Sequence, residues 1–358
     1  MSRTIMIMAG GTGGHIFPAL SVAEFLRERG WNIVWLGSRA GMEAALVPPK
    51  GYTMAWMRFS GLRGKGVLRA FMLPLNLLIA FGQSAGAIFR HRPDVVLGMG
   101  GYIAFPGGMM ASLLNRPLII HEQNSVAGLA NRVLAKLADR VLVAFPNAFA
   151  GKVSQTWIGN PVRADIGGLA APETRYEARS GRLNLLVLGG SQGALALNTT
   201  VPAALQRMPA AERPMVTHQS GAAHIDLLRE SYRAAGVEAE LVPFIDDIAA
   251  HYANADVVIC RAGASTIAEL AAVGVASVLV PLPSAVDDHQ THNAHFLSER
   301  GAALLIPQQE FTPDRLAQVL AGFARGKLLA MAQAARAAAK PDATRGVAEV
   351  CMELAHAA

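Results

Sequence analysis

The 358-residue sequence predicts an α/β protein of two doubly wound, Rossmann-like domains, each built on a parallel sheet. Apolar runs suited to strands alternate with longer helical stretches along the chain, a pattern typical of parallel sheets with right-handed crossovers. A strand that runs into a glycine turn and a helix opens the chain, and the same design returns at Leu183–Ala194. At roughly 100–200 residues per domain, the length also fits two domains.

The expected strands form two sets, and several are continuous runs of Val, Ile and Leu, as in strands that are covered on both faces. The first set is Thr4–Ala9, Ile33–Leu36, Asp94–Leu97, Leu118–His121 and Val141–Ala144. The second set is Leu183–Leu188, Met215–His218, Glu240–Val242, Asp256–Cys260 and Ala276–Val280.

The break between the sets predicts the domain limits. We expect a first domain over 1–162 and a second over 163–340, with a hinge at Gly159–Arg163, where the periodicity fails. A last helix, about 341–358, follows Pro341, and we expect it to pack back on the first domain.

The composition excludes several classes of protein. Hydrophobic residues make up 52% and charged residues 16%, which excludes a disordered chain. The net charge of +6 is modest and suits an anionic substrate or membrane surface; we expect no nucleic-acid partner. Cys260 and Cys351 form no C-x-x-C pair, so a disulfide scaffold or a cysteine-ligated zinc site is not expected. We expect neither a secretory signal nor a transmembrane segment, because the most apolar window, Phe71–Phe81, is far shorter than the about 20 residues of a spanning helix.

Three glycine loops, each at the end of an expected strand, predict phosphate binding. They are Gly10–Gly14, Gly98–Gly101 and Gly189–Gly193. Glycine lets the backbone approach a ligand, and the N-terminus of a following helix favours phosphate. The dinucleotide fingerprint fails because Ile16 stands at its last glycine position and no acidic residue ends the second strand, which disfavours a dehydrogenase.

Two acidic pairs raise the question of a metal site. We interpret Asp246-Asp247 as a helix start and Asp287-Asp288 as a loop pair, and expect no metal ligands among them.

Six motifs occur in an order that resembles one enzyme family. They are GGTGGH at 10–15, GMGGY at 98–102, HEQN at 121–124, GNPVR at 159–163, GGSQGA at 189–194 and RAGASTIAEL at 261–270. The chain resembles glycosyltransferase family 28, and within it the bacterial transferases that add N-acetylglucosamine to the lipid-linked muramoyl-pentapeptide precursor of peptidoglycan.

That resemblance implies the GT-B fold, with two Rossmann-like domains facing each other across a cleft. It implies UDP-N-acetylglucosamine as donor and undecaprenyl-pyrophosphoryl-MurNAc-pentapeptide as acceptor. It further implies inversion to a β1,4 link, transfer that needs no metal cofactor, and a role in cell-wall synthesis with cell-wall assembly proteins as possible partners.

The resemblance also assigns donor contacts. Glu269 would accept hydrogen bonds from the ribose hydroxyls, the backbone of Ile245 would read uracil, and Gln290 and Asn124 would contact the sugar. The remaining implied donor contacts are Thr12, Gly13, Gly14, Arg163, Ser191, Ala264, Ser265, Thr266, Ile267 and Ala268. His289 stands where a second Gln can occur in relatives, so the match between residues 285–290 and the positions of the family motif is less well defined.

An inverting transfer needs a base for the acceptor C4 hydroxyl. His15 is the first candidate and Glu122 the second, whereas His121 is expected to be structural. By resemblance, the acceptor side comprises Gly10, Gly11, Gly100, Gly101, Tyr102 and Asn131.

The stretch Phe71–Phe81 predicts contact with a membrane. Its apolar side chains are Phe71, Met72, Leu75, Leu78, Ile79 and Phe81. Nearby cations are Arg58, Arg63, Lys65, Arg69, Arg90 and Arg92. Apolar residues beside cations bind anionic lipid surfaces, so we expect peripheral binding at the cytoplasmic face of the bacterial inner membrane.

Two alternatives stay open at the level of sequence. A UDP-N-acetylglucosamine 2-epimerase would share the fold but need only the donor and have no use for the apolar basic stretch. A non-catalytic nucleotide-sugar sensor would keep Glu269 and Ser191 but could lose His15 and Glu122; this sequence has all four.

Overall fold

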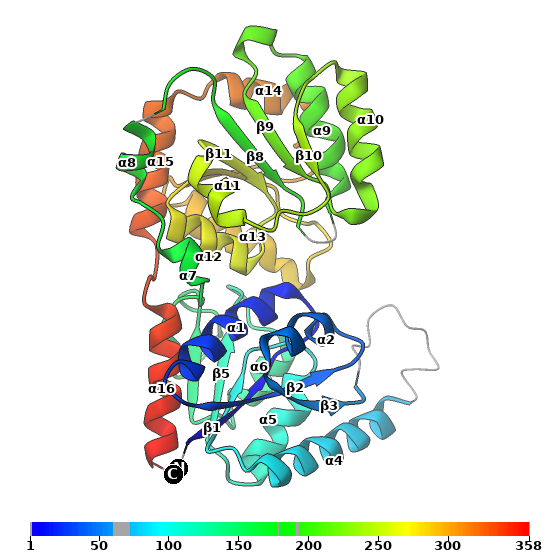
Figure 1. Ribbon diagram of the computed structural model, residues 1–358, viewed down its shortest axis with the longest axis vertical. Coiled ribbons are helices and arrows are strands. Elements are labelled where there is room, and N and C mark those ends of the chain that lie inside the picture. Colours follow the sequence, from blue (N-terminus) through cyan, green and yellow to red (C-terminus); the bar gives the residue numbers. More distant parts are fainter. Residues whose placement is uncertain (1, 60–71, 178, 191–192, 358) are drawn as a thin grey trace. The chain divides into compact units, whose positions relative to one another are not determined.

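The computed structural model describes residues 2–59, 72–177, 179–190 and 193–357 and divides the chain into two compact units (Figure 1). The first unit comprises Met1–Arg163 and Lys340–Ala358, and the second comprises Ala164–Ala339. Both units carry a parallel sheet with helices on its faces, so the predicted fold class is confirmed.

A seven-stranded parallel sheet forms the core of the first unit, in the order β3-β2-β1-β4-β5-β6-β7. Its strands are β1 (Thr4–Met8), β2 (Asn32–Ser38), β3 (Thr53–Met57), β4 (Val95–Gly98), β5 (Leu118–Glu122), β6 (Arg140–Val143) and β7 (Thr156–Trp157). The strand order turns back at β1, so β1 and β4 flank a topological switch point, where ligands bind in doubly wound sheets. Both strands are followed by a predicted glycine loop.

Helices cover both faces of this sheet, and β1 shows why. Ile5 and Ile7 join one hydrophobic cluster, and Met6 and Met8 join the cluster on the other face, since successive strand residues point to opposite faces. The last helix belongs to the first of these clusters and packs against α1. The helices are α1 (Gly13–Arg27), α2 (Glu43–Leu46), η1 (Pro48–Lys50), α4 (Leu73–His91), α5 (Ala104–Leu113), α6 (Leu129–Leu134) and α16 (Ala343–Ala357).

The second unit repeats the plan with six parallel strands, in the order β10-β9-β8-β11-β12-β13. They are β8 (Asn184–Leu188), β9 (Met215–Gln219), β10 (Glu240–Val242), β11 (Val257–Cys260), β12 (Ala276–Leu279) and β13 (Ala303–Leu305). Here β8 and β11 flank the switch point. The helices are α7 (Ala164–Gly167), α8 (Pro172–Glu177), α9 (Leu195–Gln206), η2 (Ala210–Glu212), η3 (Ala222–His224), α10 (Ile225–Ala235), α11 (Ile248–Asn254), α12 (Ala264–Val273), η4 (Val286–Asp288), α13 (His289–Ser298), α14 (Pro313–Ala321) and α15 (Arg325–Ala337).

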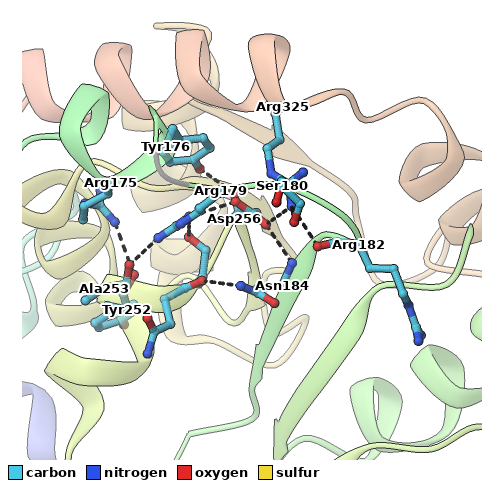
Figure 2. Close-up of polar contacts among 12 residues, drawn as sticks. Arg175, Tyr176, Arg179, Ser180, Arg182, Asn184, Tyr252, Ala253, Asp256 and Arg325 are labelled. Carbon is cyan, nitrogen blue, oxygen red and sulfur yellow. Dashed lines mark hydrogen bonds and ion pairs between the residues drawn. The ribbon is translucent and has the colours of Figure 1, made fainter.

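A buried carboxylate fastens the amino ends of the central strands of this unit (Figure 2). Asp256, which is fully buried just before β11, accepts hydrogen bonds from Arg179 Nη1 at 2.8 Å and from the backbone N–H of Asn184 at 2.8 Å. Nη2 of Arg325, at the start of α15, lies 3.4 Å from Oδ2 of Asp256, the oxygen that also accepts from Asn184. Two guanidinium groups therefore neutralise the buried charge, as burial requires. The network lies at the strand ends opposite to the glycine loops, and its role is structural.

The expected strands are all present, and no bound differs from the prediction by more than two residues. The prediction missed β3, β7 and β13. Strand β7 has only two residues, too few to show a pattern, and β3 mixes Thr, Met, Ala and Trp rather than repeating Val, Ile or Leu.

Candidate active site

The loops after β1 and β4 touch at the switch point of the first unit. Gly101 has a φ of +80°, and a Cβ there would lie 2.2 Å from the carbonyl oxygen of Gly10. A Cβ at Gly100 would lie 2.7 Å from Nδ1 of His15. Only glycine permits these approaches. The structure thus brings together Gly10, Gly100, Gly101 and His15, as the site prediction requires.

The first glycine loop leads directly into α1. Thr12 takes an extended conformation at the N-cap, and its carbonyl oxygen accepts from the N–H groups of His15 at 3.1 Å and Ile16 at 3.3 Å. Gly13 and Gly14 form the first turn, and Thr12 is exposed. A helix N-terminus of this kind favours an anionic group.

A buried glutamate that the sequence analysis missed holds this loop in place. Glu43, at the start of α2, is fully buried. Its Oε2 accepts from the N–H of Gly11 at 3.1 Å, and its Oε1 accepts from the N–H of Ser38 at 2.9 Å. A Cβ at Gly10 would lie 2.7 Å from Oε1. The surrounding glycines make room for the carboxylate, but nothing in the local pattern around Glu43 pointed to it.

The HEQN segment supplies a second histidine and a glutamine to the same place. His15 Nδ1 lies 2.9 Å from Oε1 of Gln123, and Nε2 of Gln123 lies 3.1 Å from Nδ1 of His121. Nε2 of His121 lies 2.9 Å from the carbonyl oxygen of Gly159. His121 is fully buried, and burial lowers its pKa to about 4. Gln123, to which the sequence analysis gave no role, therefore links the two histidines.

Glu122 faces the loop that follows β5. Its Oε1 accepts from the backbone N–H of Asn124 at 2.9 Å and from the Asn124 side chain at 3.3 Å. Its Oε2 accepts from Nδ2 of Asn131 at 2.9 Å and from the N–H of Gly128 at 3.2 Å. Both carboxylate oxygens thus accept hydrogen bonds from the loop and from α6. Three of the predicted site residues, Glu122, Asn124 and Asn131, form one cluster.

Tyr102 borders the first glycine loop, and Arg163 lies beside the helix that follows this loop. A Cβ at Gly11 would lie 3.4 Å from the Tyr102 ring, and burial raises the pKa of the Tyr102 hydroxyl, assisted by the charge of Glu43. The guanidinium carbon of Arg163 lies 6.0 Å from the centre of the Phe17 ring on α1. Arg163 therefore lies beside the helix whose first turn carries His15.

In the second unit, the loops after β8 and β9 are tied together by a glutamine. Gln219, at the end of β9, donates from Nε2 to the carbonyl oxygen of Gly190 at 3.2 Å and accepts from the N–H of Ile245 at 3.0 Å. Gly193 has a φ of +78°, and a Cβ there would lie 2.2 Å from the carbonyl oxygen of Ser220. Ser191 lies outside the described residues, so its predicted donor contact stays a prediction.

The loop after β11 opens α12 with the predicted donor segment. Gly263 is the extended N-cap, and the first turns carry Ala264, Ser265, Thr266, Ile267 and Ala268. Ile267 is fully buried, and its N–H donates to the carbonyl oxygen of Gly263 at 2.9 Å, so its predicted donor contact stays a prediction. Glu269 accepts a hydrogen bond from the Tyr252 hydroxyl at 3.1 Å. On α13, Oε1 of Gln290 accepts from the N–H of Leu282 at 3.0 Å, which shapes the loop after β12.

One member of each acidic pair has a local structural role. Oδ1 of Asp247 accepts from the N–H of Ala250 at 3.0 Å and so caps α11, and Oδ1 of Asp288 accepts from the Thr291 hydroxyl at 2.7 Å. Within the described ranges, no three His, Cys, Asp or Glu side chains gather as a metal site would require.

Comparisons with known proteins agree on one family. The model of the glycosyltransferase family 28 N-terminal domain matches residues 5–143, and that of the family 28 C-terminal domain matches residues 184–347. The UDP-N-acetylglucosamine–N-acetylmuramyl-(pentapeptide) pyrophosphoryl-undecaprenol N-acetylglucosamine transferase of Cupriavidus metallidurans is 61% identical over 354 residues, covering 99% of both chains. The protein of the same name from Nitrosospira multiformis is 60% identical over 354 residues, again covering 99% of both chains. The crystal structure of Acinetobacter baumannii MurG is 39% identical, covers 98% of this chain and 99% of its own, and superposes with a TM-score of 0.85.

Proposed function

Because the chain belongs to glycosyltransferase family 28, we propose a specific reaction for it: transfer of N-acetylglucosamine from UDP-N-acetylglucosamine to the C4 hydroxyl of MurNAc in undecaprenyl-pyrophosphoryl-MurNAc-pentapeptide. The protein is an N-acetylglucosaminyltransferase of peptidoglycan synthesis. The observation that carries this assignment is the 61% identity to a transferase of that name over 99% of both chains. The product has an inverted, β1,4 linkage.

His15 is the base for the acceptor hydroxyl. Its ring lies beside Gly100 at the switch point of the first unit, and its Nδ1 is held by Gln123 at 2.9 Å. A histidine can accept a proton near neutral pH. Glu122 is less suited to this role, because its two oxygens accept four hydrogen bonds from Asn124, Gly128 and Asn131. In our proposal, Glu122 shapes the acceptor loop.

The acceptor diphosphate binds at the glycine loops of the first unit. Gly10, Gly11, Gly100, Gly101 and Tyr102 meet at the carboxyl ends of β1 and β4. Backbone N–H groups and a helix N-terminus suit a diphosphate. Asn131 contributes on the acceptor side, and its buried Oδ1 has no hydrogen-bond partner among the described residues.

The donor is bound chiefly by the second unit. The Glu269 carboxylate accepts from the ribose hydroxyls, with Tyr252 orienting it. The backbone of Ile245 reads uracil through its carbonyl oxygen, because its N–H donates to Oε1 of Gln219 at 3.0 Å. The first turns of α12, with Gln290 and Asn124, contact the phosphates and sugar. Arg163 and the helix N-termini stabilise the leaving diphosphate, and so the transfer proceeds without a metal cofactor.

The first unit also binds an anionic membrane surface through α4. Apolar side chains along this helix are exposed: Met72, Leu75, Leu78, Ile79 and Phe89, with Leu113 exposed at the end of the adjoining α5. Positions 72, 75, 78 and 79 share one helical face. Arg90 and Arg92 lie at the end of α4. Phe81 instead packs against Phe105, with ring centres 6.2 Å apart. The predicted contributions of Phe71, Arg63, Lys65 and Arg69 lie outside the described residues.

The mode of association is peripheral. No helix in the described part of the chain is long and apolar enough to cross a bilayer. An exposed apolar helix face with cations at its end binds a lipid surface by burial and by charge together. Because the proposed acceptor is lipid-linked, we propose that the reaction takes place at the cytoplasmic face of the inner membrane.

The test is UDP release from UDP-N-acetylglucosamine in EDTA, with and without a short-chain lipid-linked muramoyl-pentapeptide. We expect release that requires the acceptor and survives EDTA. Release without the acceptor would indicate epimerase or hydrolase chemistry instead. UDP binding without release under either condition would indicate a nucleotide-sugar sensor.

A further inference from the structure

A continuous series of hydrogen bonds runs from the His15 ring to the backbone of the segment before Arg163. It passes from His15 Nδ1 to Gln123 Oε1 at 2.9 Å, from Gln123 Nε2 to His121 Nδ1 at 3.1 Å, and from His121 Nε2 to the Gly159 carbonyl oxygen at 2.9 Å. Gln123 and His121 are both buried. Neither has been given a part in the reaction so far.

The donor and acceptor roles along this series of hydrogen bonds are fixed at its buried end. The carbonyl oxygen of Gly159 can only accept, so Nε2 of His121 must carry a proton. Burial lowers the pKa of His121 to about 4, so at neutral pH the ring holds a single proton. Nδ1 of His121 is therefore an acceptor, and the group facing it must be a donor.

The Gln123 amide is oriented by that acceptor. Its Nε2 lies 3.1 Å from Nδ1 of His121 and 3.2 Å from the carbonyl oxygen of the same residue. A flipped amide would direct its oxygen at these two acceptors, which is unfavourable in a buried place. Oε1 of Gln123 must then face His15, and an amide oxygen only accepts.

The consequence reaches the His15 ring. Facing an acceptor, Nδ1 of His15 must carry the proton, and in the neutral ring Nε2 is then unprotonated. The ring cannot easily turn to exchange its nitrogens, because Gly100 packs against it closely enough that a Cβ would lie 2.7 Å from Nδ1.

We propose that Gln123 and His121 are positioning residues that hold His15 in the Nδ1–H tautomer, with Nε2 ready to accept the proton of the attacking hydroxyl. This inference rests on the proposed transferase function, in which His15 is the base. It assigns Gln123 a task that an apolar residue of the same shape could not perform, since the amide must donate on one side and accept on the other.

The direct test is ¹⁵N NMR of the full chain with labelled histidine, at about pH 8, which is above the ordinary range for histidine. The His15 signals are identified by their loss in His15→Gln. We expect a protonated Nδ1 and an unprotonated Nε2. A wild-type His15 with the proton on Nε2 would overturn the proposal, whatever any variant does.

Kinetics of Gln123→Met provide the second test. Methionine keeps the length and burial of the side chain but neither donates nor accepts as an amide does. We expect His15 to lose its single tautomer and kcat to fall roughly 10- to 100-fold, with little change in the KM for UDP-N-acetylglucosamine. A variant that kept the wild-type tautomer and kcat would contradict the proposal.

Val347→Ala serves as the stability control. Val347 is fully buried in the same unit, on α16, and its truncation lowers stability without touching the series. It should leave the His15 tautomer and kcat unchanged; a loss of kcat equal to that of Gln123→Met would assign the effect to stability and sink the proposal. Failure of the wild type to release UDP with acceptor would refute the proposed function, whereas the tautomer measurement does not depend on activity.

Discussion

Nδ2 of Asn131, on α6, donates a hydrogen bond to Oε2 of Glu122 at 2.9 Å and thereby joins the end of β5 to the helix that follows it. The carboxylate also accepts hydrogen bonds from the backbone N–H groups of Asn124 and Gly128. One side chain thus organises the whole connection between strand and helix. The same carboxylate was a candidate base, and the two roles make different predictions.

Glu122→Gln tests these roles. The amide would present N–H groups to donors that now face an oxygen, which costs about 1–3 kcal/mol of stability for a buried group left unpaired. We expect a lower free energy of unfolding and a higher KM for the acceptor, with kcat reduced by less than about tenfold. Denaturant unfolding and acceptor titrations measure both. A loss of kcat as large as that of His15→Gln, with stability unchanged, would make Glu122 the base.

Glu269 provides the test of donor recognition. Its carboxylate is oriented by the Tyr252 hydroxyl at 3.1 Å and, in our proposal, accepts from the ribose. A hydrogen bond to a charged group contributes about 1.5–3 kcal/mol, so Glu269→Ala should weaken UDP binding by roughly 10- to 150-fold in calorimetry. Glu230→Ala, at an exposed position on α10, is the matched control and should bind UDP as the wild type does. Equal affinities for Glu269→Ala and the wild type would remove Glu269 from the donor site.

The membrane proposal depends on α4. Leu78 is 67% exposed, and burying a leucine contributes about 1.5–3 kcal/mol. Leu78→Asp should therefore reduce partitioning into anionic vesicles by about tenfold or more. Co-sedimentation with the vesicles measures this partitioning. Leu227→Asp, an exposed leucine on α10, controls for the added charge and should sediment as the wild type does. If Leu78→Asp sediments with vesicles as strongly as the wild type, α4 is not the lipid-binding element.

Two buried histidines predict acid sensitivity. Burial lowers the pKa of His218 to about 3 and that of His121 to about 4, below the ordinary value near 6.5. Below about pH 6.5 the unfolded chain binds protons that the folded chain does not, so stability falls as the pH falls. Between pH 6.5 and pH 5, each histidine should lower the free energy of unfolding by up to about 2 kcal/mol.

His218→Gln isolates one of these contributions. His218 is held by the Tyr232 hydroxyl at 3.0 Å and Asn198 Oδ1 at 3.1 Å, and glutamine cannot titrate in this range. Urea unfolding at about pH 7 and about pH 5 should show a smaller loss for the variant than for the wild type. The same loss in both proteins would mean that His218 does not contribute to the acid sensitivity.

Much of this architecture was predictable, because its signals are local. At Gly10, Gly98 and Gly189, the strand and the glycine turn that ends it lie within a few residues of each other in the sequence. In the structure each of these turns follows a strand that borders a switch point. Strand β7, with two residues, is too short to show a period. The α/β class and the family were confirmed; the individual site residues remain proposals.

The residues that hold the site together were not predictable in the same way. Each forms a hydrogen bond with a residue far away in the sequence. Glu43 and Gly11 are 32 positions apart, Gln123 and His15 are 108 positions apart, and Gln219 and Ile245 are 26 positions apart. The sequence on either side of each residue does not distinguish it from other polar residues. Its partner is far away in the sequence and comes into contact only because the sheet places two loops side by side. Gln123 does fall within the HEQN segment, which was the one available signal.

The base assignment is tested most directly by single-turnover transfer with His15→Gln, using saturating UDP-N-acetylglucosamine and a short-chain lipid-linked acceptor. Loss of the general base should slow transfer by about 10²- to 10⁴-fold, while UDP affinity stays within about twofold of the wild type. Transfer at a rate within about threefold of the wild type, with UDP binding intact, would show that His15 Nε2 does not take the acceptor proton.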